Sequence, residues 1–334
     1  MSWLKKIYWK YFFAIPLFQL LHAIIFSPGF RREIISVYTG IHRHKVKKIG
    51  IGLKYKLRRN IHRLEKGLIM EPRRPVFALS YIGETISVYE KTILFLDDKD
   101  SELKWFNHVL DEFFSVTAEH PIIDKASEKY SKCKKEFSIK ESRKSVPIER
   151  KNFAKSSVDY DAFFKLCRLR RSVRWYQDKK VPRELVDKAI LSASQSPSAC
   201  NRQPFKFRIF DDPSLVEKIS SIPGGTVGFT HQFPMIIVIV GELDAYEYDR
   251  DRHLIYIDGS LAAMTFMLAL ETVGLSSCPI NWSGVEEKEV LMDKALDLKA
   301  TERPIMLISV GYAKDEGKIP FSHKKGLSEI RKYN

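Results

Sequence analysis

The sequence predicts two structural parts: a helical N-terminal region and a C-terminal domain in which helices and strands are mixed. Apolar residues recur at helical spacing in the first part, as in Tyr55–Met70. The second part contains three strand-like apolar runs, Phe205–Phe210, Met235–Val240 and Pro304–Tyr312, with helical segments between them. The chain has 334 residues, of which 44% are hydrophobic and 29% charged, so it has room for two folded domains with real cores.

Charge is unevenly distributed between the two parts. Residues 1–150 contain 29 Lys and Arg against 17 Asp and Glu, whereas residues 151–334 contain 27 against 24. The excess positive charge therefore belongs to the N-terminal half, and the second half is nearly balanced, as expected of a soluble catalytic domain. Four widely spaced cysteines with no CxxC pair argue against a zinc site and a disulfide framework, and they suit a reducing compartment.

Residues 1–52 are expected to form a basic and apolar segment at a membrane surface. Tyr11–Phe30 has no formally charged residue, but its strongly apolar part, Tyr11–Phe26, is shorter than the roughly 20 residues of a spanning helix. Aromatic and basic flanks favour a helix in the membrane interface, ahead of a helix docked on the protein's own core and of a true span. No small-residue cleavage site follows, so a signal peptide is not expected.

The basic residues of 42–48 are expected to face anionic lipid headgroups. His42 and His44 have no nearby metal-ligand partners in the sequence, so we interpret them as exposed polar residues and expect no metal site.

Residues 53–120 are expected to form a helical region, and residues 121–157 a charged linker. Three helices are predicted, over Tyr55–Met70, Val76–Leu96 and Leu103–Phe114. The stretch Lys125–Lys155 is polar and poor in large apolar residues, as linkers are. The helices are basic, but no helix-turn-helix, zinc or RNA-binding signature accompanies them, so nucleic acid is not an expected partner.

Residues 158–334 form the second predicted domain. Its helices are predicted over Pro182–Ser194, Pro213–Ser221, His253–Gly274 and Glu286–Asp297. The Gly-rich loop Ile222–Phe233 lacks the GxGxxG spacing and the strand–helix frame of a Rossmann site. The helix starting at His253 is apolar nearly all round, and Ala262, Ala263 and Ala269 would allow close helix packing, either at a subunit interface or in the core.

A tight basic cluster opens this domain: Arg170, Arg171, Ser172 and Arg174 fall within five residues. Three guanidiniums and a hydroxyl at this spacing can grip a phosphate. Taken alone, such a cluster is more often a solvated helix end or a generic basic patch.

One predicted helix later comes a polar turn, residues 196–204, with the sequence SPSACNRQP. It offers a hydroxyl, two carboxamides and free backbone N–H groups, which a flat heteroaromatic ligand uses along its edge. Taken alone, it is a loop between a helix and a strand.

The two motifs in this order resemble those of the nitroreductase family of FMN-dependent oxidoreductases. Later elements extend the resemblance: the GLSSCPINW segment, the PIMLISVGY strand and a basic tail. The resemblance covers roughly residue 158 to the C-terminus. It implies an α+β fold, a nitroreductase-like mixed and mainly antiparallel sheet flanked by helices, here preceded by a helical N-terminal region. It also implies a homodimer with FMN at the subunit interface.

The resemblance also implies roles for particular residues. The FMN phosphate and ribityl chain would be held by Arg170, Ser172 and Arg174, with Arg171 nearby as part of the same cofactor-binding cluster. The flavin would be lined by Pro197, Ser198, Asn201 and Gln203, and contacted by Pro279, Ile280 and Asn281. Lys324 or Lys325 would complete the phosphate grip, although Gly326 follows where the family often has Pro. No catalytic nucleophile or acid is expected, and Cys278 is interpreted as a small buried thiol.

The function implied is hydride transfer from NAD(P)H to FMN and then to an unidentified small-molecule acceptor, by ping-pong chemistry. The HRLEKGL segment resembles an N-terminal extension of nitroreductase-like proteins linked to surface-polysaccharide genes, which suggests a polysaccharide context. The expected location is the cytoplasm, peripheral to the inner face of the cell membrane.

Two alternative functions remain open: a membrane-associated scaffold on this fold without redox turnover, and a flavin-consuming or oxidising enzyme. A scaffold has no physical need for a phosphate grip, so the RRSVR element favours an enzyme.

Overall fold

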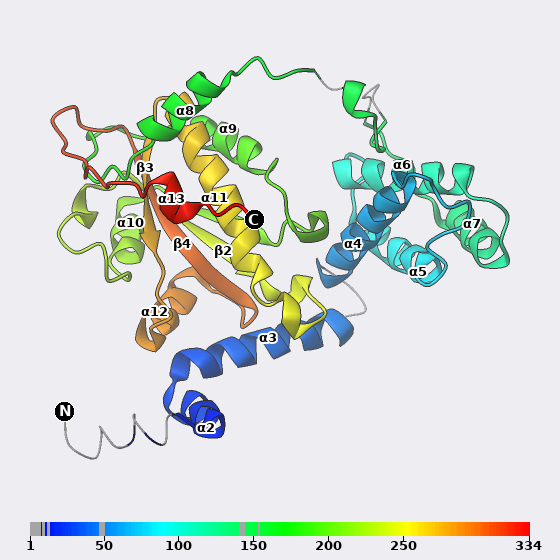
Figure 1. Ribbon diagram of the computed structural model, residues 1–334, viewed down its shortest axis with the longest axis horizontal. Helices are drawn as coiled ribbons and strands as arrows, with labels where there is room; N and C mark the ends of the chain where they lie inside the picture. Colours follow the sequence, from blue (N-terminus) through cyan, green and yellow to red (C-terminus); the bar gives the residue numbers. More distant parts are fainter. Residues whose placement is uncertain (1–7, 9–10, 12–13, 47–50, 140–143, 153) are drawn as a thin grey trace.

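The computed structural model describes residues 8, 11, 14–46, 51–139, 144–152 and 154–334. Figure 1 shows two groups of elements: a sheet covered by helices, and a group that contains α4, α5, α6 and α7 and is joined to the first by a long segment. The first helices are α2 (Pro16–Phe26), α3 (Pro28–Val46), α4 (Ile51–Leu68), α5 (Ile82–Thr92), α6 (Ser101–Val116) and α7 (Pro121–Cys133). The domain that follows has α8 (Tyr160–Leu169), α9 (Arg183–Ala193), α10 (Pro213–Ser220), α11 (Leu254–Thr272), α12 (Glu286–Leu296) and α13 (Leu327–Ile330), with strands β1 (Phe205–Phe210), β2 (Met235–Glu242), β3 (Ser276–Asn281) and β4 (Glu302–Gly311). Short 3₁₀ turns lie at Ile93–Phe95 (η2), Arg150–Asn152 (η3), Ala199–Asn201 (η4), Thr230–Gln232 (η5), Leu243–Ala245 (η6) and Asp249–Asp251 (η7).

The four strands form one antiparallel sheet in the order β1-β2-β4-β3. All of β2 is buried, and its side chains alternate between two cores as a strand requires. Met235, Ile237 and Ile239 pack with α11 on one face, whereas Ile236 and Val238 pack with α10 and α12 on the other. The α+β fold class expected from the sequence is therefore confirmed.

Helix α11 is the central helix of this domain. Ala262 and Ala263 are fully buried in the core between α11 and the sheet. A Cβ at Gly259 would lie 2.4 Å from Ile305 Cδ1, so the helix approaches β4 more closely than a side chain there would allow. Of the two interpretations of these small residues, packing against the domain's own sheet is the one that the structure shows for Ala262 and Ala263.

The four helices α4–α7 form a helical unit with a core of its own. Leu57, Ile61 and Leu64 of α4 are fully buried in it. Each such side chain contributes about 1.5–3 kcal/mol relative to an exposed one. The predicted helix over 76–96 is shorter in the structure, because Ala78 has a left-handed φ of 64° and α5 begins only at Ile82.

The linker expected over residues 121–157 starts later in the structure. Residues 121–133 form α7, and its Ile123, Ala126 and Tyr130 lie in the core of the helical unit. These three residues recur at helical spacing within a polar stretch, which is why composition alone concealed the helix. The segment between α7 and α8 is then the connection that Figure 1 shows crossing from one group to the other.

Helix α3 docks along the sheet domain, and α2 does not. The His44 ring Nδ1 lies 2.9 Å from Asp244 O, and a Cβ at Gly40 would lie 2.8 Å from Leu243 O. His44 is buried, so its interpretation as an exposed polar residue was wrong, and burial lowers its pKa. Arg43 donates to Thr301 Oγ1 at 3.2 Å, so part of the basic segment contacts protein. Lys47 and Lys48 lie outside the described residues.

Candidate cofactor-binding site

The Arg170–Arg174 element lies between the end of α8 and the start of β3. Ser172 pairs with Ser277 in a β-bridge, and Val173 N donates to Ser277 O at 3.0 Å. Tyr176, which is 1% exposed, donates its hydroxyl to Val173 O at 2.8 Å. Buried neighbours therefore fix the backbone of the element, while its three arginines stay only partly buried.

The C-terminal tail brings a further basic side chain to this element. Arg171 donates to Pro320 O at 2.7 Å and also to Phe321 O. A cavity of about 820 Å³ lies between the tail and α8, and its basic lining residues are Arg168, Arg170, Arg171 and Lys324. Lys325 is exposed and is not among the lining residues. Of the two candidate lysines, the structure therefore brings Lys324 to the basic cluster.

Three buried polar atoms in and around the basic element have no hydrogen-bond partner among the described residues: Arg170 Nε, Ser277 Oγ and Glu271 Oε1. Of these three residues, Arg170 lines the cavity. Buried polar atoms are normally paired, so each one calls for an explanation. A phosphate oxygen in the cavity could accept from Arg170 Nε with charge-assisted geometry. Ser277, whose backbone pairs with Ser172, lies next to the same basic element. The residues present therefore fit a phosphate group.

The carboxylate of Glu271, at the C-terminal end of α11, is close enough to Arg170 to interact with its charge. Burial raises its pKa to about 7, while the charge of Arg170 and a hydrogen bond to Ser276 act in the opposite direction. Neither Glu271 nor Ser277 was predicted as a site residue from the sequence. Ser277 directly precedes the CPIN segment, which the resemblance to the nitroreductase family assigns to the flavin, and this position could have identified it as a site residue.

Arg174 is directed away from the cavity, toward the Gly-rich loop. Its guanidinium carbon lies 5.8 Å from the centre of the Phe229 ring, and its NH1 donates to Ser172 O at 3.4 Å. Gln232 accepts from Tyr176 N at 2.6 Å and donates to Arg174 O. The structure thus brings Arg170 and Arg171 together at the cavity and places Arg174 beside them, at the loop that contains η5.

Strand β3 carries Pro279, Ile280 and Asn281 along the edge of the sheet. It pairs with β4 on one side, so its outer edge offers backbone groups to a ligand. The Ile280 side chain is 5% exposed and belongs to the core between the sheet and α12, whereas Asn281 is exposed. Cys278 is 2% exposed and burial raises the pKa of its thiol, which confirms that it is a buried thiol.

The second motif, Ser196–Gln203, lies against the N-terminal half of α11. Ala199 N donates to Asp258 Oδ2 at 3.0 Å, and Ser196 Oγ donates to Thr265 Oγ1 at 2.8 Å. Within the turn, Gln203 N donates to Ser198 Oγ at 3.0 Å. Ser198, Asn201 and Gln203 are partly buried and Pro197 is exposed. The structure therefore brings these predicted residues together in one compact turn.

The two motifs contact different parts of α11 in a single chain. The turn contacts Asp258, whereas the basic element lies near Glu271, thirteen residues further on. At 1.5 Å per helical residue these two positions are about 20 Å apart along the helix. The part of the turn that contacts Asp258 is therefore set well apart from the basic element of the same chain, whereas Ser196, at the start of the turn, contacts Thr265.

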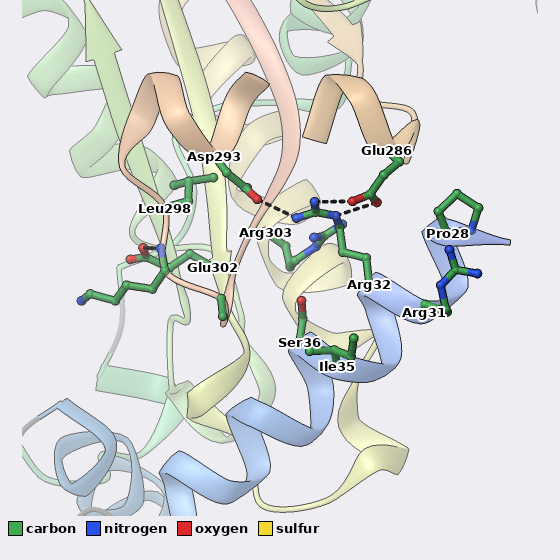
Figure 2. Close-up of a pocket in the computed structure, with 12 residues that line it drawn as sticks. Pro28, Arg31, Arg32, Ile35, Ser36, Glu286, Asp293, Leu298, Glu302 and Arg303 are labelled. Atoms are coloured by element: carbon green, nitrogen blue, oxygen red, sulfur yellow. Dashed lines mark hydrogen bonds and ion pairs between the residues drawn. The ribbon is translucent and has the colours of Figure 1, made fainter. Parts of the chain in front are cut away.

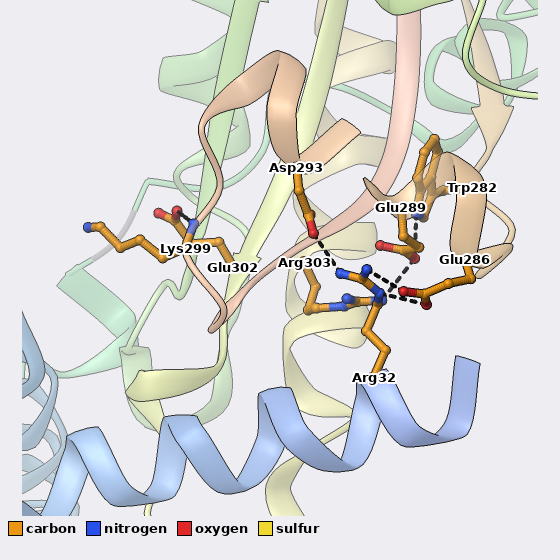
Figure 3. Close-up of polar contacts among 8 residues, drawn as sticks. All are labelled: Arg32, Trp282, Glu286, Glu289, Asp293, Lys299, Glu302 and Arg303. Atoms are coloured by element: carbon orange, nitrogen blue, oxygen red, sulfur yellow. Dashed lines mark hydrogen bonds and ion pairs between the residues drawn. The ribbon is translucent and has the colours of Figure 1, made fainter. Parts of the chain in front are cut away.

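Another cavity, of about 480 Å³, lies under α3 and is away from both motifs (Figure 2). Arg32 of α3 donates to Glu286 at 2.6 and 2.9 Å and to Asp293 at 2.6 Å. Deeper in the same network, Arg303 and Trp282 both donate to Glu289 Oε1 (Figure 3). The Arg32 guanidinium lowers the pKa of Glu286, whereas burial raises that of Glu289. This network joins α3 to α12 and accounts for the docking of α3.

Comparison with known proteins places the domain in a family. The nitroreductase family profile matches residues 168–227 and 220–312. A protein assigned as an NADH dehydrogenase/NAD(P)H nitroreductase in Archaeoglobus fulgidus is 30% identical over 156 residues, which are 46% of this chain and 86% of that protein. The chain belongs to the nitroreductase family. The family suggests an oxidoreductase, and its members in the comparisons resemble the second half of this chain.

Other nitroreductase-family relatives have different names. Iodotyrosine deiodinase 1 of Pongo abelii is 25% identical over 199 residues, covering 50% of this chain and 67% of that protein. The solved structure of an FMN-dependent nitroreductase from Clostridium difficile R20291 has 24% identity and a TM-score of 0.45, and the match covers 51% of this chain and 99% of that one.

Proposed function

We propose that this nitroreductase-family protein is an FMN-dependent oxidoreductase that takes hydride from NAD(P)H and reduces a small-molecule acceptor. The observation that carries the proposal is the unpartnered buried donor Arg170 Nε in a cavity that Lys324 also lines, with a second unpartnered buried donor, Ser277 Oγ, on the strand that pairs with the same basic element. A scaffold without cofactor gains nothing from burying donors that stay unpaired, because each costs free energy.

FMN, when bound, would supply the redox chemistry of the reaction. The chain's own part is to bind and orient it. Arg170, Ser277 and Lys324 would hold the phosphate, and the free edge of β3 at Pro279–Asn281 would offer backbone groups to the ring. Cys278 takes no part, because its thiol is buried and its pKa raised.

A homodimer would complete this site. The exposed face of α11 carries Ile257, Leu261 and Met264, which are 52%, 44% and 40% exposed and lie at helical spacing. Two α11 helices packed antiparallel through this stripe would bring the basic element of one chain to the turn of the other. The separation of the two motifs along α11 supports this arrangement, since it leaves each chain with half of the contacts.

We also propose that α2 lies in a membrane interface. It has no buried residue, and its large apolar side chains are 38–68% exposed. At 11 residues it is about 16 Å long, shorter than the hydrocarbon core of about 30 Å. Arg31 donates to Ile24 O at 3.1 Å and to Ile25 O at 2.5 Å, which satisfies carbonyls that lipid cannot. Flotation with anionic vesicles tests this proposal, and wild-type protein that stays unbound would contradict it.

Among the described residues, one helix is long and apolar enough to cross a membrane, Asp249–Thr272. It contains α11, which packs in the core of the sheet domain, so we interpret it as a core helix. The proposed location is accordingly the cytoplasm, with α2 on the inner face of the cell membrane. The polysaccharide context stays a prediction.

The decisive experiment is the visible spectrum of purified protein, followed by anaerobic addition of NADH and NADPH. Flavin bands that bleach on addition would support the reductase. Bands that persist would exclude NAD(P)H as the donor and favour an oxidising or flavin-consuming role. Colourless protein that cannot be reconstituted with FMN would exclude the flavoenzyme and favour a scaffold without redox turnover. Because relatives include both nitroreductases and iodotyrosine deiodinases, the acceptor panel should contain a nitroarene and an iodotyrosine.

A further inference from the structure

Helix α4 of the helical unit contacts the turn that the proposed function assigns to the flavin. Arg58, which is 9% exposed, donates from Nε to Asn201 O at 2.8 Å. Its NH2 donates to Gln203 Oε1 at 3.2 Å. One guanidinium from outside the region that matches the family therefore holds the backbone at one predicted flavin-lining residue and the side chain of another.

The turn needs such support because its backbone is unusual. Cys200, Asn201 and Gln203 have φ values of 53°, 51° and 51°, in the left-handed region, and none of them is glycine. Non-glycine residues in this region persist where the surroundings over-determine them. Gln203 has a second anchor, since its Nε2 donates to Ser194 O at 2.9 Å. The Arg58 contacts fix the Gln203 carboxamide from the opposite end, at its oxygen.

Arg58 is itself fixed inside the helical unit. Its NH1 pairs with Glu102 at the start of α6, and Lys54 pairs with the other oxygen of the same carboxylate. The guanidinium carbon also lies 5.2 Å from the centre of the Trp105 ring. The flanking Leu57 is fully buried in the unit's core. The position of the guanidinium is therefore set by the packing of α4 on α6.

We propose that Arg58 is a positioning residue of the flavin site, and that the helical unit thereby forms part of that site. This inference rests on the proposed function, because the turn is a flavin contact only if FMN binds. The helical unit would then be required for cofactor affinity, and removing the Arg58 contacts would loosen the turn without touching the phosphate grip at Arg170.

The test compares three full-length variants for FMN affinity by fluorescence titration: Arg58→Gln, Arg58→Lys and, as the matched control, Arg63→Gln. Arg63 lies on the same helix but stacks on Tyr81 at 3.6 Å within the helical unit. Arg58→Gln should weaken FMN binding at least tenfold and shift the visible bands of the bound flavin. Arg58→Lys keeps the charge but offers one nitrogen, so its FMN affinity should lie between those of Arg58→Gln and wild type. The FMN affinity of Arg63→Gln should equal that of wild type.

Two further measurements separate positioning from general destabilisation. Hydrogen exchange in the apo protein should be faster at residues 199–203 in Arg58→Gln and unchanged in the core of the helical unit. If Arg58→Gln does not fold, Glu102→Gln keeps the arginine but removes its ion pair, and should weaken FMN binding by a smaller factor. Wild-type FMN affinity and spectrum in a folded Arg58→Gln or, failing that, in Glu102→Gln, would overturn the inference. Wild-type protein that binds no FMN would overturn the proposed function itself.

Discussion

The helical unit and the sheet domain differ in where each leaves apolar side chains exposed. The helical unit closes its core among α4, α5, α6 and α7, with Leu57, Ile61, Leu64, Phe106 and Phe113 fully buried. The sheet domain also has fully buried cores, yet it leaves an apolar stripe on α11 and apolar residues on α8 and the tail at the surface. An exposed stripe on the central helix of a domain is typical of an interface. The helical unit also exposes apolar side chains, such as Leu94 and Phe95, but these lie on the short turn η2 and not along a central helix. The α11 stripe therefore fits the proposed homodimer, whereas the exposed residues of the helical unit suggest no such interface.

The largest expected effect comes from breaking that interface. Leu261→Asp places a charge in the middle of the α11 stripe, where the proposed dimer would bury it without a partner. We expect wild type to be a dimer and Leu261→Asp a monomer, with FMN affinity reduced by about a hundredfold or more because each site loses its second half. Analytical ultracentrifugation and FMN titration measure the two effects.

Leu94→Asp is the matched control for this change. Leu94 is 75% exposed on η2 of the helical unit, so the same substitution there should change neither oligomeric state nor cofactor affinity. A Leu261→Asp protein that remains dimeric and yellow would show that the α11 stripe is not the interface.

The next largest effect tests whether Arg170 of the sheet domain binds the phosphate of FMN. Arg170→Ala removes a charged donor, and a hydrogen bond to a charged group contributes about 1.5–3 kcal/mol, or roughly 10- to 150-fold in affinity. Riboflavin lacks the phosphate, so its affinity should be unchanged in Arg170→Ala. The ratio of FMN to riboflavin affinity therefore isolates the phosphate contact, and Arg58→Gln should weaken both ligands equally.

Arg183→Ala serves as the control for a lost surface arginine, since Arg183 pairs with Asp211 on the exposed start of α9. Arg174→Ala is expected to have a smaller effect than Arg170→Ala, because its guanidinium faces Phe229 instead of the cavity. Equal loss of FMN and riboflavin in Arg170→Ala would refute the phosphate assignment.

Local sequence patterns predicted most helices and strands and the two motifs of the candidate site. The periodicity of the chain placed α9, α10, α11 and α12 within a few residues, and β1 with its bounds as observed. The RRSVR and SPSACNRQP motifs were found because their residues are adjacent in the sequence. Strand β3 was not assigned as a strand, since it contains Pro279, which only an edge strand tolerates well.

Contacts between distant residues could not be predicted in the same way. Arg58 reaches Asn201 and Gln203 across more than 140 residues of sequence, and nothing in either segment specifies the other. The same holds for Arg32 with Glu286 and for the burial of His44, because a charged or polar residue in a basic run looks solvated until its partner is known. Glu271 was missed for a related reason: its special environment comes from burial beside Arg170, which its own neighbours do not reveal.

The smallest expected effect is a pH dependence of FMN affinity, which we attribute to Glu271 of the sheet domain. The pKa of Glu271, about 7 in the folded protein, is above its ordinary value of 4.5, so burial favours the neutral carboxyl. The stability that this group contributes is fully present below pH 4.5 and is lost as the pH rises through about 7. A phosphate bound at Arg170 would add negative charge nearby and raise the pKa of Glu271 further, so FMN binding should take up a proton above pH 7. We expect FMN affinity to fall severalfold, up to about tenfold, between pH 7 and 8.5, where the second phosphate ionisation (pKa about 6) is already complete.

Two variants test whether Glu271 causes this fall. Glu271→Gln should abolish the fall and keep the affinity seen at pH 7, whereas Glu184→Gln, on the exposed start of α9, should show the same fall as wild type. A pH-independent affinity in wild type would mean that Glu271 does not sense the bound phosphate, and the ligand would then lie on the far side of Arg170.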